Sequence, residues 1–405
     1  MSYHYLLDLA IILMSTKILG LVTKKFHMPQ VVGALLAGLI LGPAMLNIIQ
    51  ETEFIKQTAE LGVIALMFAA GLETDIKEMK KTGKASIIIA LFGVIIPLLG
   101  GLAVAALLNT KEFAVPETPM ILQNIFVGII LTATSVSITV ETLKEMGKLS
   151  TPVGNAILGA ALIDDILGII ALTLITSLAD TSVNVGIVLL KIALFFVFSG
   201  IIGFGFYRFF RKWTMKDDED RRRYVIIAFV FCLLLAYIAE EVFGVADITG
   251  AFLAGLIISN TIKRDYISHR FETMSYLLLS PVFFASIGLT VEIEQMSIQL
   301  MIFAGALLIV AILTKIIGCG IGAKFCGYSG KEALQIGTGM ISRGEVALIV
   351  ASKGASLGLL STVLFGPIVI MVVVTTILTP ILLKMVFKNS EVENRTTEKK
   401  TVKVA

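Results

Sequence analysis

The sequence is poor in the residues from which disulfide frameworks and metal centres are built. Its 405 residues include three cysteines, three histidines and a single tryptophan. The cysteines lack the spacing of a ligand set, and the histidines stand at the ends of apolar stretches or between them. We therefore expect no disulfide framework, no haem or zinc centre inside the protein, and no cofactor.

Charge is scarce as well. Only 16% of the residues are charged, and the net charge of +3 is too small to indicate a nucleic-acid partner. Neither an H-E-x-x-H nor a P-loop pattern occurs. In contrast, 57% of the residues are hydrophobic and the mean hydropathy is +0.93. This composition is typical of a protein embedded in a lipid bilayer, and enzymatic activity is not expected.

Apolar stretches long enough to cross a membrane recur along the chain. A helix needs about 20 mainly apolar residues to span the hydrocarbon core. The expected fold class is an all-α polytopic membrane protein with 13 transmembrane helices. We place these helices at 5–22, 30–49, 57–72, 85–107, 121–143, 153–178, 184–207, 224–242, 246–260, 274–291, 298–323, 332–352 and 357–387.

Basic residues test this number, because Lys and Arg concentrate in cytoplasmic loops. With thirteen spans, most of the 33 Lys and Arg residues fall on one side, and only Lys56, Lys111 and Lys353 fall opposite. The amino terminus is therefore expected outside the cell, and the tail at 388–405 in the cytoplasm.

Two segments of the chain resemble each other. Residues 33–40 read GALLAGLI and residues 250–257 read GAFLAGLI, and the next span of each half carries a further match, at 68–72 and 284–289. The second copy begins seven spans after the first. An odd number of spans reverses the direction in which the second copy crosses the membrane. We expect inverted repeats of six helices each, with the substrate site near the midplane in broken helices. Chance recurrence of Gly, Ala and Leu strings is the alternative.

Asp164 and Asp165 lie in the middle of the sixth span. They are about twelve residues into it, or about 18 Å deep. A charged side chain at that depth costs roughly 3 kcal/mol, so a consecutive pair indicates function more than packing. Adjacent residues of a helix diverge by about 100°, so the two carboxylates can hold different roles.

Two other spans have the composition of broken helices. The fifth carries a run of hydroxyls in mid-span that includes Thr132, Thr134 and Ser135, and such a run can unwind and offer oxygens to a cation, or can form ordinary hydrogen bonds between helices. The twelfth, in the matching position of the second half, is interrupted by three glycines around Arg343 and Glu345. We expect a structural role for these two charges, since a guanidinium does not release its proton.

Lys315 lies about nine residues from the cytoplasmic end of the eleventh span, too deep to reach water easily. It needs a counter-ion, and Asp164 and Asp165 are the acids at that depth. A Lys–Asp bridge that breaks on protonation or cation binding would act as a switch. Extension of the lysine toward the interface is the alternative.

Three strings together resemble the cation:proton antiporter superfamily, in particular its second branch of NapA-type and Kef-type bacterial exchangers. They are TATSVSIT at 132–139, AALIDDILG at 160–168 and SRGEV at 342–346. The resemblance covers nearly the whole chain. It implies the NhaA-like antiporter fold, in which two broken helices cross, and a multi-pass protein of a prokaryotic plasma membrane.

The resemblance also implies a homodimer in which a core moves like an elevator against a dimerisation part. In this chain the transmembrane domain would be 1–387. The parts would be a dimerisation part at about 5–72 and 224–291, a linker helix at 184–207, a core at about 85–178 and 298–387, and the tail at 388–405.

By the same resemblance, Asp165 binds the cation and the proton, Asp164 pairs with Lys315, and Thr132, Thr134 and Ser135 belong to the broken helix. Members with Asp-Asp and a core lysine resemble electrogenic exchangers. Kef-type proteins carry a cytoplasmic nucleotide-binding domain, whereas this sequence ends about 18 residues after its last expected span. Na+ is therefore expected over K+, and Li+ stays open. The alternatives are K+/H+ antiport, a cation-coupled organic anion symporter, and a sensor or channel-like subunit.

Overall fold

The computed structural model describes residues 3–26, 28–74, 76–110, 112–116, 118–179, 185–214, 222–291 and 296–402. Within these ranges the chain forms helices joined by short turns, without a strand. The helices are α1 (His4–Lys25), α2 (Gln30–Leu41), α3 (Glu53–Glu73), α4 (Ile76–Leu108), α5 (Met120–Ile130), α6 (Val136–Glu145), α7 (Pro152–Ala179), α8 (Val185–Thr214), α9 (Arg222–Tyr237), η1 (Ile238–Val242), α10 (Asp247–Ile258), α11 (Arg264–Met274), η2 (Ser275–Leu279), α12 (Ser280–Leu289), α13 (Ile298–Phe325), α14 (Gly330–Gly339), α15 (Glu345–Ser356), η3 (Thr362–Leu364) and α16 (Phe365–Val402).

Nine helical stretches in the described ranges are long and apolar enough to cross a membrane, and four shorter apolar helices accompany them. Each of the thirteen expected segments overlaps one of these helices or a pair of them. The all-helical membrane architecture is thus confirmed. The number of thirteen crossings depends on the shorter helices as well and stays a prediction.

Several helix ends differ from the expected boundaries. α4 begins at Ile76 instead of residue 85, and α11, η2 and α12 run without interruption from Arg264 instead of residue 274. α16 continues to Val402, through residues expected to form a tail. The expected boundaries follow apolarity, which marks the edge of the bilayer. Lys, Arg and Glu favour the helical conformation, so a helix can continue past that edge.

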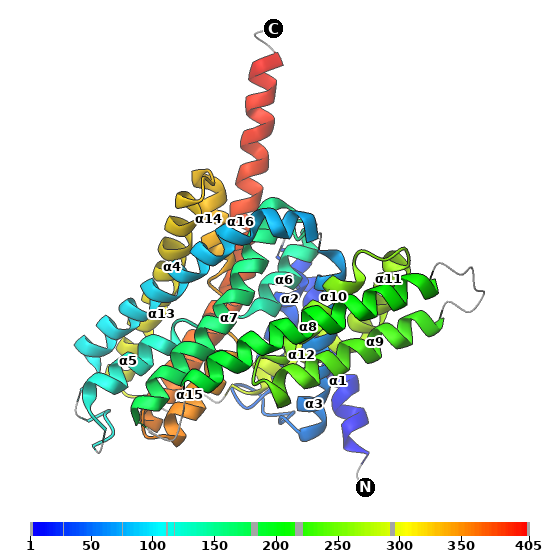
Figure 1. Cartoon of the computed structure of the whole chain (residues 1–405). Helices are drawn as coiled ribbons and strands as arrows, with labels where there is room; N and C mark the ends of the chain where they lie inside the picture. The colour runs from blue at the N-terminus through cyan, green and yellow to red at the C-terminus, as the bar shows by residue number, and fades with distance from the viewer. Residues whose placement is uncertain are drawn as a thin grey trace.

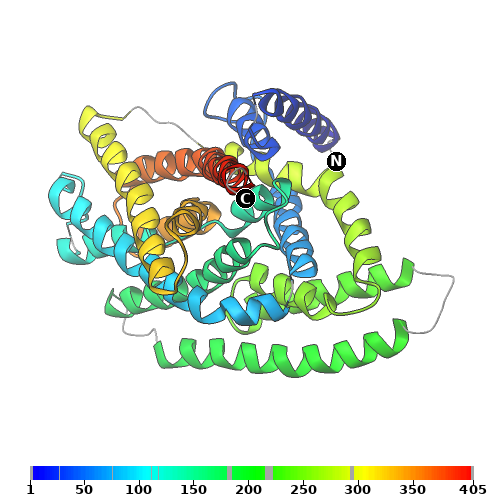
Figure 2. The same ribbon diagram turned by 90° about the horizontal axis from the view of Figure 1, so that it is seen from above.

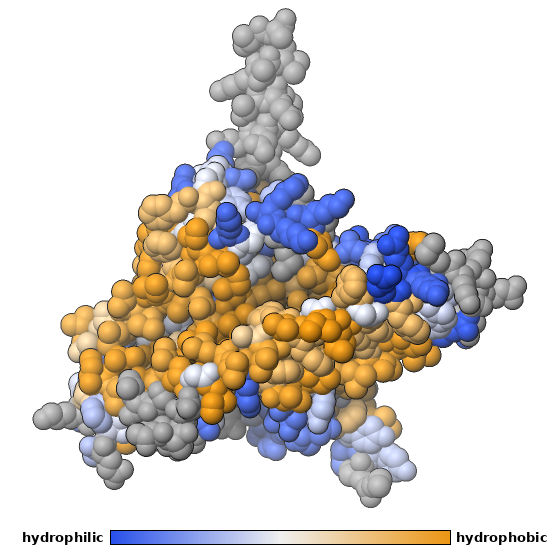
Figure 3. All heavy atoms as spheres, in the orientation of Figure 1, coloured by the Kyte–Doolittle hydropathy of each residue, from blue (hydrophilic) through white to orange (hydrophobic). Residues whose placement is uncertain are grey.

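An apolar belt crosses the face of the molecule seen in Figure 3, and hydrophilic residues gather above and below it. Inside the belt, packing divides the helices into two groups. One group contains α4, α5, α7, α13, α14 and α16, and the other contains α1, α2, α3, α9, α10 and α12 (Figures 1 and 2). The long helix α8 runs along one edge of the molecule, opposite α1 and α2 (Figure 2).

Glycines let helices of the second group cross at backbone contact. A Cβ on Gly38 of α2 would overlap the carbonyl of Ala285 in α12, and one on Gly288 of α12 would overlap the backbone of α2. The crossing of α3 with α10 is built in the same way, from Gly71 and Gly255. The two crossings use equivalent positions of the two similar segments, because Gly255 lies as far from Gly38 as Gly288 lies from Gly71.

Gly255→Ala should destabilise the protein, because the new methyl group would overlap the Phe68 carbonyl and force α3 and α10 apart. Overpacking of this kind costs roughly 1–3 kcal/mol. Gly305→Ala is the matched control, since a Cβ there meets nothing within 4 Å. Thermal unfolding in detergent should give a lower melting temperature for Gly255→Ala only. Equal melting temperatures would show that the crossing tolerates a side chain.

Candidate functional site

Two of the helical segments are interrupted inside the apolar belt. The chain unwinds at 131–135, between α5 and α6, and again at 340–344, between α14 and α15. In the first break the Thr132 hydroxyl donates a hydrogen bond to the carbonyl of Ile129, at 2.7 Å, and the Thr132 N–H donates to the same carbonyl at 2.9 Å. Hydroxyl side chains compete with helical hydrogen bonds, which favours unwinding here.

The two unwound segments are bonded to each other. The Ser135 N–H donates to the carbonyl of Ser342 at 2.8 Å, and the Ser342 hydroxyl donates to the carbonyl of Ser135 at 2.8 Å. Thr139 adds a hydrogen bond from its hydroxyl to the Gly339 carbonyl, at 2.7 Å. A Cβ on Gly344 would lie 2.8 Å from the Ser135 hydroxyl, so a glycine is required for this close approach. The two breaks therefore cross at contact distance.

Arg343 lies in the second break and is fully buried. Its guanidinium donates to the carbonyl of Leu131 at 2.7 Å, to that of Ala311 at 3.3 Å, and to that of Ile341. Leu131 and Ile341 stand just past the carboxyl ends of α5 and α14, where helix dipoles place negative charge. Arg343 thus compensates both interrupted helices with one cation. The Thr376 hydroxyl of α16 donates to the Arg343 carbonyl and fixes its backbone.

Lys315 of α13 and Asp164 of α7 form a buried ion pair. The lysine nitrogen lies 3.0 Å from both carboxylate oxygens, and neither side chain is exposed. Gly93 of α4 borders the pair, and a Cβ there would lie 3.7 Å from the lysine nitrogen and 2.6 Å from the sulfur of Cys319. Thr134, in the first break, is buried nearby, and its hydroxyl has no hydrogen-bond partner among the described residues. The pair is therefore enclosed by α4, α7, α13 and the crossing.

Asp165 faces a small cavity beside this pair. The side chain is 8% exposed, and the cavity of about 70 Å³ has room for about two water molecules. Both aspartates and Thr132 line it, and its remaining walls are largely apolar. The wall residues are Ile129, Ala133, Gly168, Ile169, Leu172, Ala246, Val346 and Val350. Ala246 comes from the turn before α10, in the other helix group. The cavity thus lies at the boundary between the two groups.

The structure brings four of the expected site residues together, namely Asp164, Asp165, Lys315 and Thr132. Thr134 lies beside them, whereas the Ser135 hydroxyl lies 3.2 Å from that of Ser137, on the crossing. Glu345 begins α15, and its side chain lies outside the part that the structure describes.

Sequence reasoning did not identify several contacts of the site. The carbonyls of Leu131 and Ala311 bind Arg343, yet a backbone acceptor has no signature in a sequence. Ala246 lines the cavity from a distant turn, and no motif marks it. Thr139 and Ser342 were visible as parts of polar strings, but their partners depend on how the breaks cross.

Two other kinds of site, a metal site and a hydrolase nucleophile, are not formed in the part of the chain that the structure describes. Among the residues that the structure describes, no group of three or more His, Cys, Asp and Glu side chains is placed to hold a metal ion. Residues 354–358 read GASLG, which matches the G-x-S-x-G pattern of hydrolases. The string ends α15 instead of following a strand, so the strand-to-helix turn that exposes a nucleophile is missing.

Several known proteins are similar to this chain over most of its length. The family model described as "Sodium/hydrogen exchanger, transmembrane" matches residues 10–389. The Na(+)/H(+)-K(+) antiporter GerN of Bacillus cereus is 39% identical over 96% of this chain and 97% of its own length. The Na(+)/H(+) antiporter of Enterococcus hirae is 37% identical over 93% and 96%.

A solved structure shares the fold. The sodium proton antiporter MjNhaP1 of Methanocaldococcus jannaschii superposes with a TM-score of 0.66 at 20% identity, over 93% of this chain and 95% of that one. The resemblance read from the three sequence strings is confirmed at the level of the family, and the second-branch assignment stays a prediction. The buried ion pair, the crossing breaks and these matches lead to one conclusion: the chain belongs to the transmembrane sodium/hydrogen exchanger family, and is a multi-pass secondary transporter that needs no cofactor, not an enzyme.

Proposed function

We propose that this protein exchanges Na+ for H+ across the membrane, with Asp165 as the carrier of both ions and the Lys315–Asp164 pair as the switch. The observation that carries the proposal is the 3.0 Å ion pair next to a cavity that Asp165 lines, at the crossing of two broken helices. The names of the two bacterial relatives, a Na+/H+-K+ antiporter and a Na+/H+ antiporter, support the choice of ions.

The chemistry follows from competition for the same oxygens. A proton on Asp165 removes the charge that would hold a cation, and a bound cation disfavours the proton. Asp164 can join the cation only if it releases Lys315, and a lysine that loses its counter-ion in an apolar site loses its proton readily.

This exchange predicts electrogenic transport. With protons bound, Asp165 is neutral and the Lys315–Asp164 pair sums to zero. With the cation bound between two carboxylates and Lys315 neutral, the site carries one negative charge. A cycle then moves two protons against one cation, and net charge crosses the membrane.

The cavity favours a small ion over an organic substrate. Pockets for organic ligands usually have about 300–1,000 Å³, and this one has about 70 Å³. An organic anion symporter is therefore disfavoured. K+ is the second candidate cation, since the name of the Bacillus cereus relative includes it.

We further propose that the two helix groups correspond to a core and a dimerisation part, and that transport moves one against the other. Ala246 of the second group lines the cavity of the first, which supports a site at a sliding boundary. The paired glycine crossings and the short helices α2 and α10 at equivalent positions support inverted repeats and thirteen spans. We expect a homodimer, an external amino terminus and α8 as the linker.

Asp165→Asn should abolish exchange, because an amide neither binds a proton at neutral pH nor attracts a cation with a full charge. The measurement is the internal pH of proteoliposomes after external addition of Na+, with K+ and Li+ compared in parallel. Glu53→Gln, an exposed carboxylate at the start of α3, is the control and should transport normally. Exchange that survives in Asp165→Asn would remove this residue from the site.

Lys315→Gln should destabilise the protein by roughly 3–5 kcal/mol, because it leaves Asp164 charged and buried without a partner. The double variant Lys315→Gln/Asp164→Asn should recover most of that loss in thermal unfolding. Exchange that remains in Lys315→Gln should no longer respond to an imposed membrane potential. A wild-type voltage response in this variant would exclude the ion pair from coupling.

Arg343→Lys should lower the melting temperature, since one ammonium cannot reach the three carbonyls that the guanidinium binds. Each buried carbonyl left without a donor costs roughly 1–3 kcal/mol. Arg211→Lys, on an exposed part of α8, is the control. If both variants melt at the wild-type temperature, Arg343 does not hold the crossing together.

A further inference from the structure

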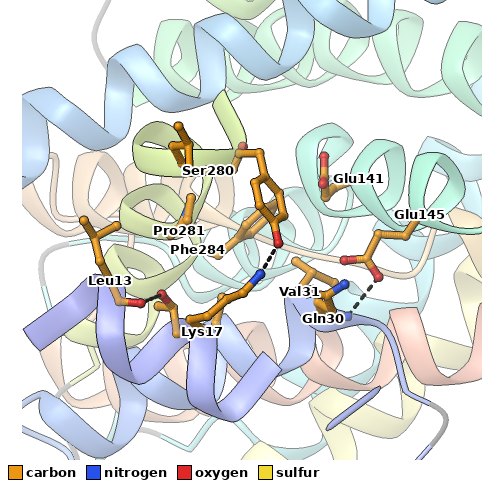
Figure 4. Close-up of a pocket in the computed structure, with 13 residues that line it drawn as sticks. Leu13, Lys17, Gln30, Val31, Glu141, Glu145, Ser280, Pro281 and Phe284 are labelled. Carbon is orange, nitrogen blue, oxygen red and sulfur yellow. Dashed lines mark hydrogen bonds between the residues drawn. The ribbon is translucent and has the colours of Figure 1, made fainter. Parts of the chain in front are cut away.

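A second and larger cavity lies apart from the ion pair, near the end of the molecule where α1 carries its basic residues and α2 begins. It has a volume of about 290 Å³, and among the described residues it shares no lining residue with the cavity at Asp165. Its walls come from α1, α2, α6, η2 and α12 (Figure 4). The apolar part of the lining is formed by Leu13, Val31, Ala34, Leu277, Pro281 and Phe284.

One wall of this cavity carries a positive charge. The Lys17 nitrogen donates a hydrogen bond to the Tyr276 hydroxyl, which links α1 to η2 across the opening (Figure 4). Lys17 lies about 10 Å along α1 from Lys24 at the helix end, within reach of the interface for an extended lysine. Met14 and Ile18 beside it are 61% and 53% exposed, so α1 presents this wall at the apolar surface of the protein.

The opposite wall carries negative charge. Glu141 and Glu145 line it from successive turns of α6 (Figure 4). Glu145 accepts a hydrogen bond from the Gln30 N–H at 2.8 Å and so caps the start of α2. The lysine nearest to them on α6, Lys144, bonds to Glu73 at 3.1 Å, a carboxylate of α3 outside the cavity. Lys24 and Lys384 also act on Glu145, so the acidic wall consists of two carboxylates whose charge these lysines partly balance.

Charges of opposite sign across an apolar cavity suit a ligand that is itself dipolar and partly apolar. We propose that this cavity binds a zwitterionic phospholipid with a primary ammonium headgroup, of the phosphatidylethanolamine class. The phosphate would accept hydrogen bonds from Lys17 and Tyr276. The ammonium would donate hydrogen bonds to Glu141 and Glu145. The part of the acyl chains nearest to the headgroup would contact Leu13 and Phe284.

Other membrane lipids fit the walls less well. The glycerol hydroxyls of phosphatidylglycerol can donate hydrogen bonds to the two carboxylates, but they carry no positive charge to neutralise them. A choline headgroup has the positive charge but no N–H to donate, so it forfeits the charge-assisted hydrogen bonds. A bare cation would face Lys17 in the same cavity.

Native mass spectrometry of the detergent-purified protein tests the proposal with three lipids that have identical acyl chains. Phosphatidylethanolamine should bind about tenfold more tightly than phosphatidylcholine or phosphatidylglycerol, the ratio expected from charge-assisted hydrogen bonds. This comparison needs no variant. Equal binding of the three lipids, or tighter binding of phosphatidylglycerol, would overturn the proposal.

Two variants test which wall of the cavity binds which part of the lipid headgroup. Glu141→Gln should remove the preference for phosphatidylethanolamine over phosphatidylcholine, and Lys17→Gln should weaken all three lipids alike. Glu60→Gln, whose carboxylate lines a different cavity between α3 and α12, is the control and should keep the preference. If Glu141→Gln instead raises the KM for Na+ and leaves the lipid preference intact, the cavity is a vestibule for cations and the lipid assignment fails.

Discussion

Lys315 and Asp164 hold opposite charges inside the protein, 3.0 Å apart and without solvent exposure of either side chain. Removing each ion from water costs several kcal/mol, and their attraction offsets this only while both remain charged and in place. The pair is thus stable in one protonation state and costly in any other. Under the proposed exchange, a site built in this way would convert the arrival of a proton or a cation into a change of structure, which an uncharged pair could not do.

The surroundings of the pair depend on the same constraint. Broken helices expose backbone carbonyls inside the membrane, where each open acceptor is expensive. Arg343 covers two of them, at Leu131 and Ile341, and also bonds to the Ala311 carbonyl of α13, while the bonds between Ser135 and Ser342 join the two breaks directly. Under the proposed exchange, the oxygens that a transported ion needs would be available because other groups satisfy the rest of the unwound backbone.

The sequence allowed much of this arrangement to be predicted. Asp164, Asp165 and Lys315 were identifiable because charge at the centre of an apolar span is expensive, and the two breaks because hydroxyls and glycines interrupt those spans. The contacts of Arg343 were not predictable, since carbonyls occur at every residue and only the crossing selects Leu131 and Ala311. The start of α4 at Ile76 was missed for another reason: apolarity records the bilayer, whereas hydrogen bonding determines where a helix ends.

The two consecutive aspartates show why position on a helix matters more than residue type. Asp164 points toward α13 and is held by Lys315, and Asp165, about 100° further around α7, lines a cavity that Ala246 of the other helix group closes. The larger cavity lies between α6, which packs on helices of both groups, and α1, α2 and α12 of the second group. If α6 moves with the core, both cavities change shape in the same step, so a lipid held in one would bear on the rate at which the ion in the other is exchanged.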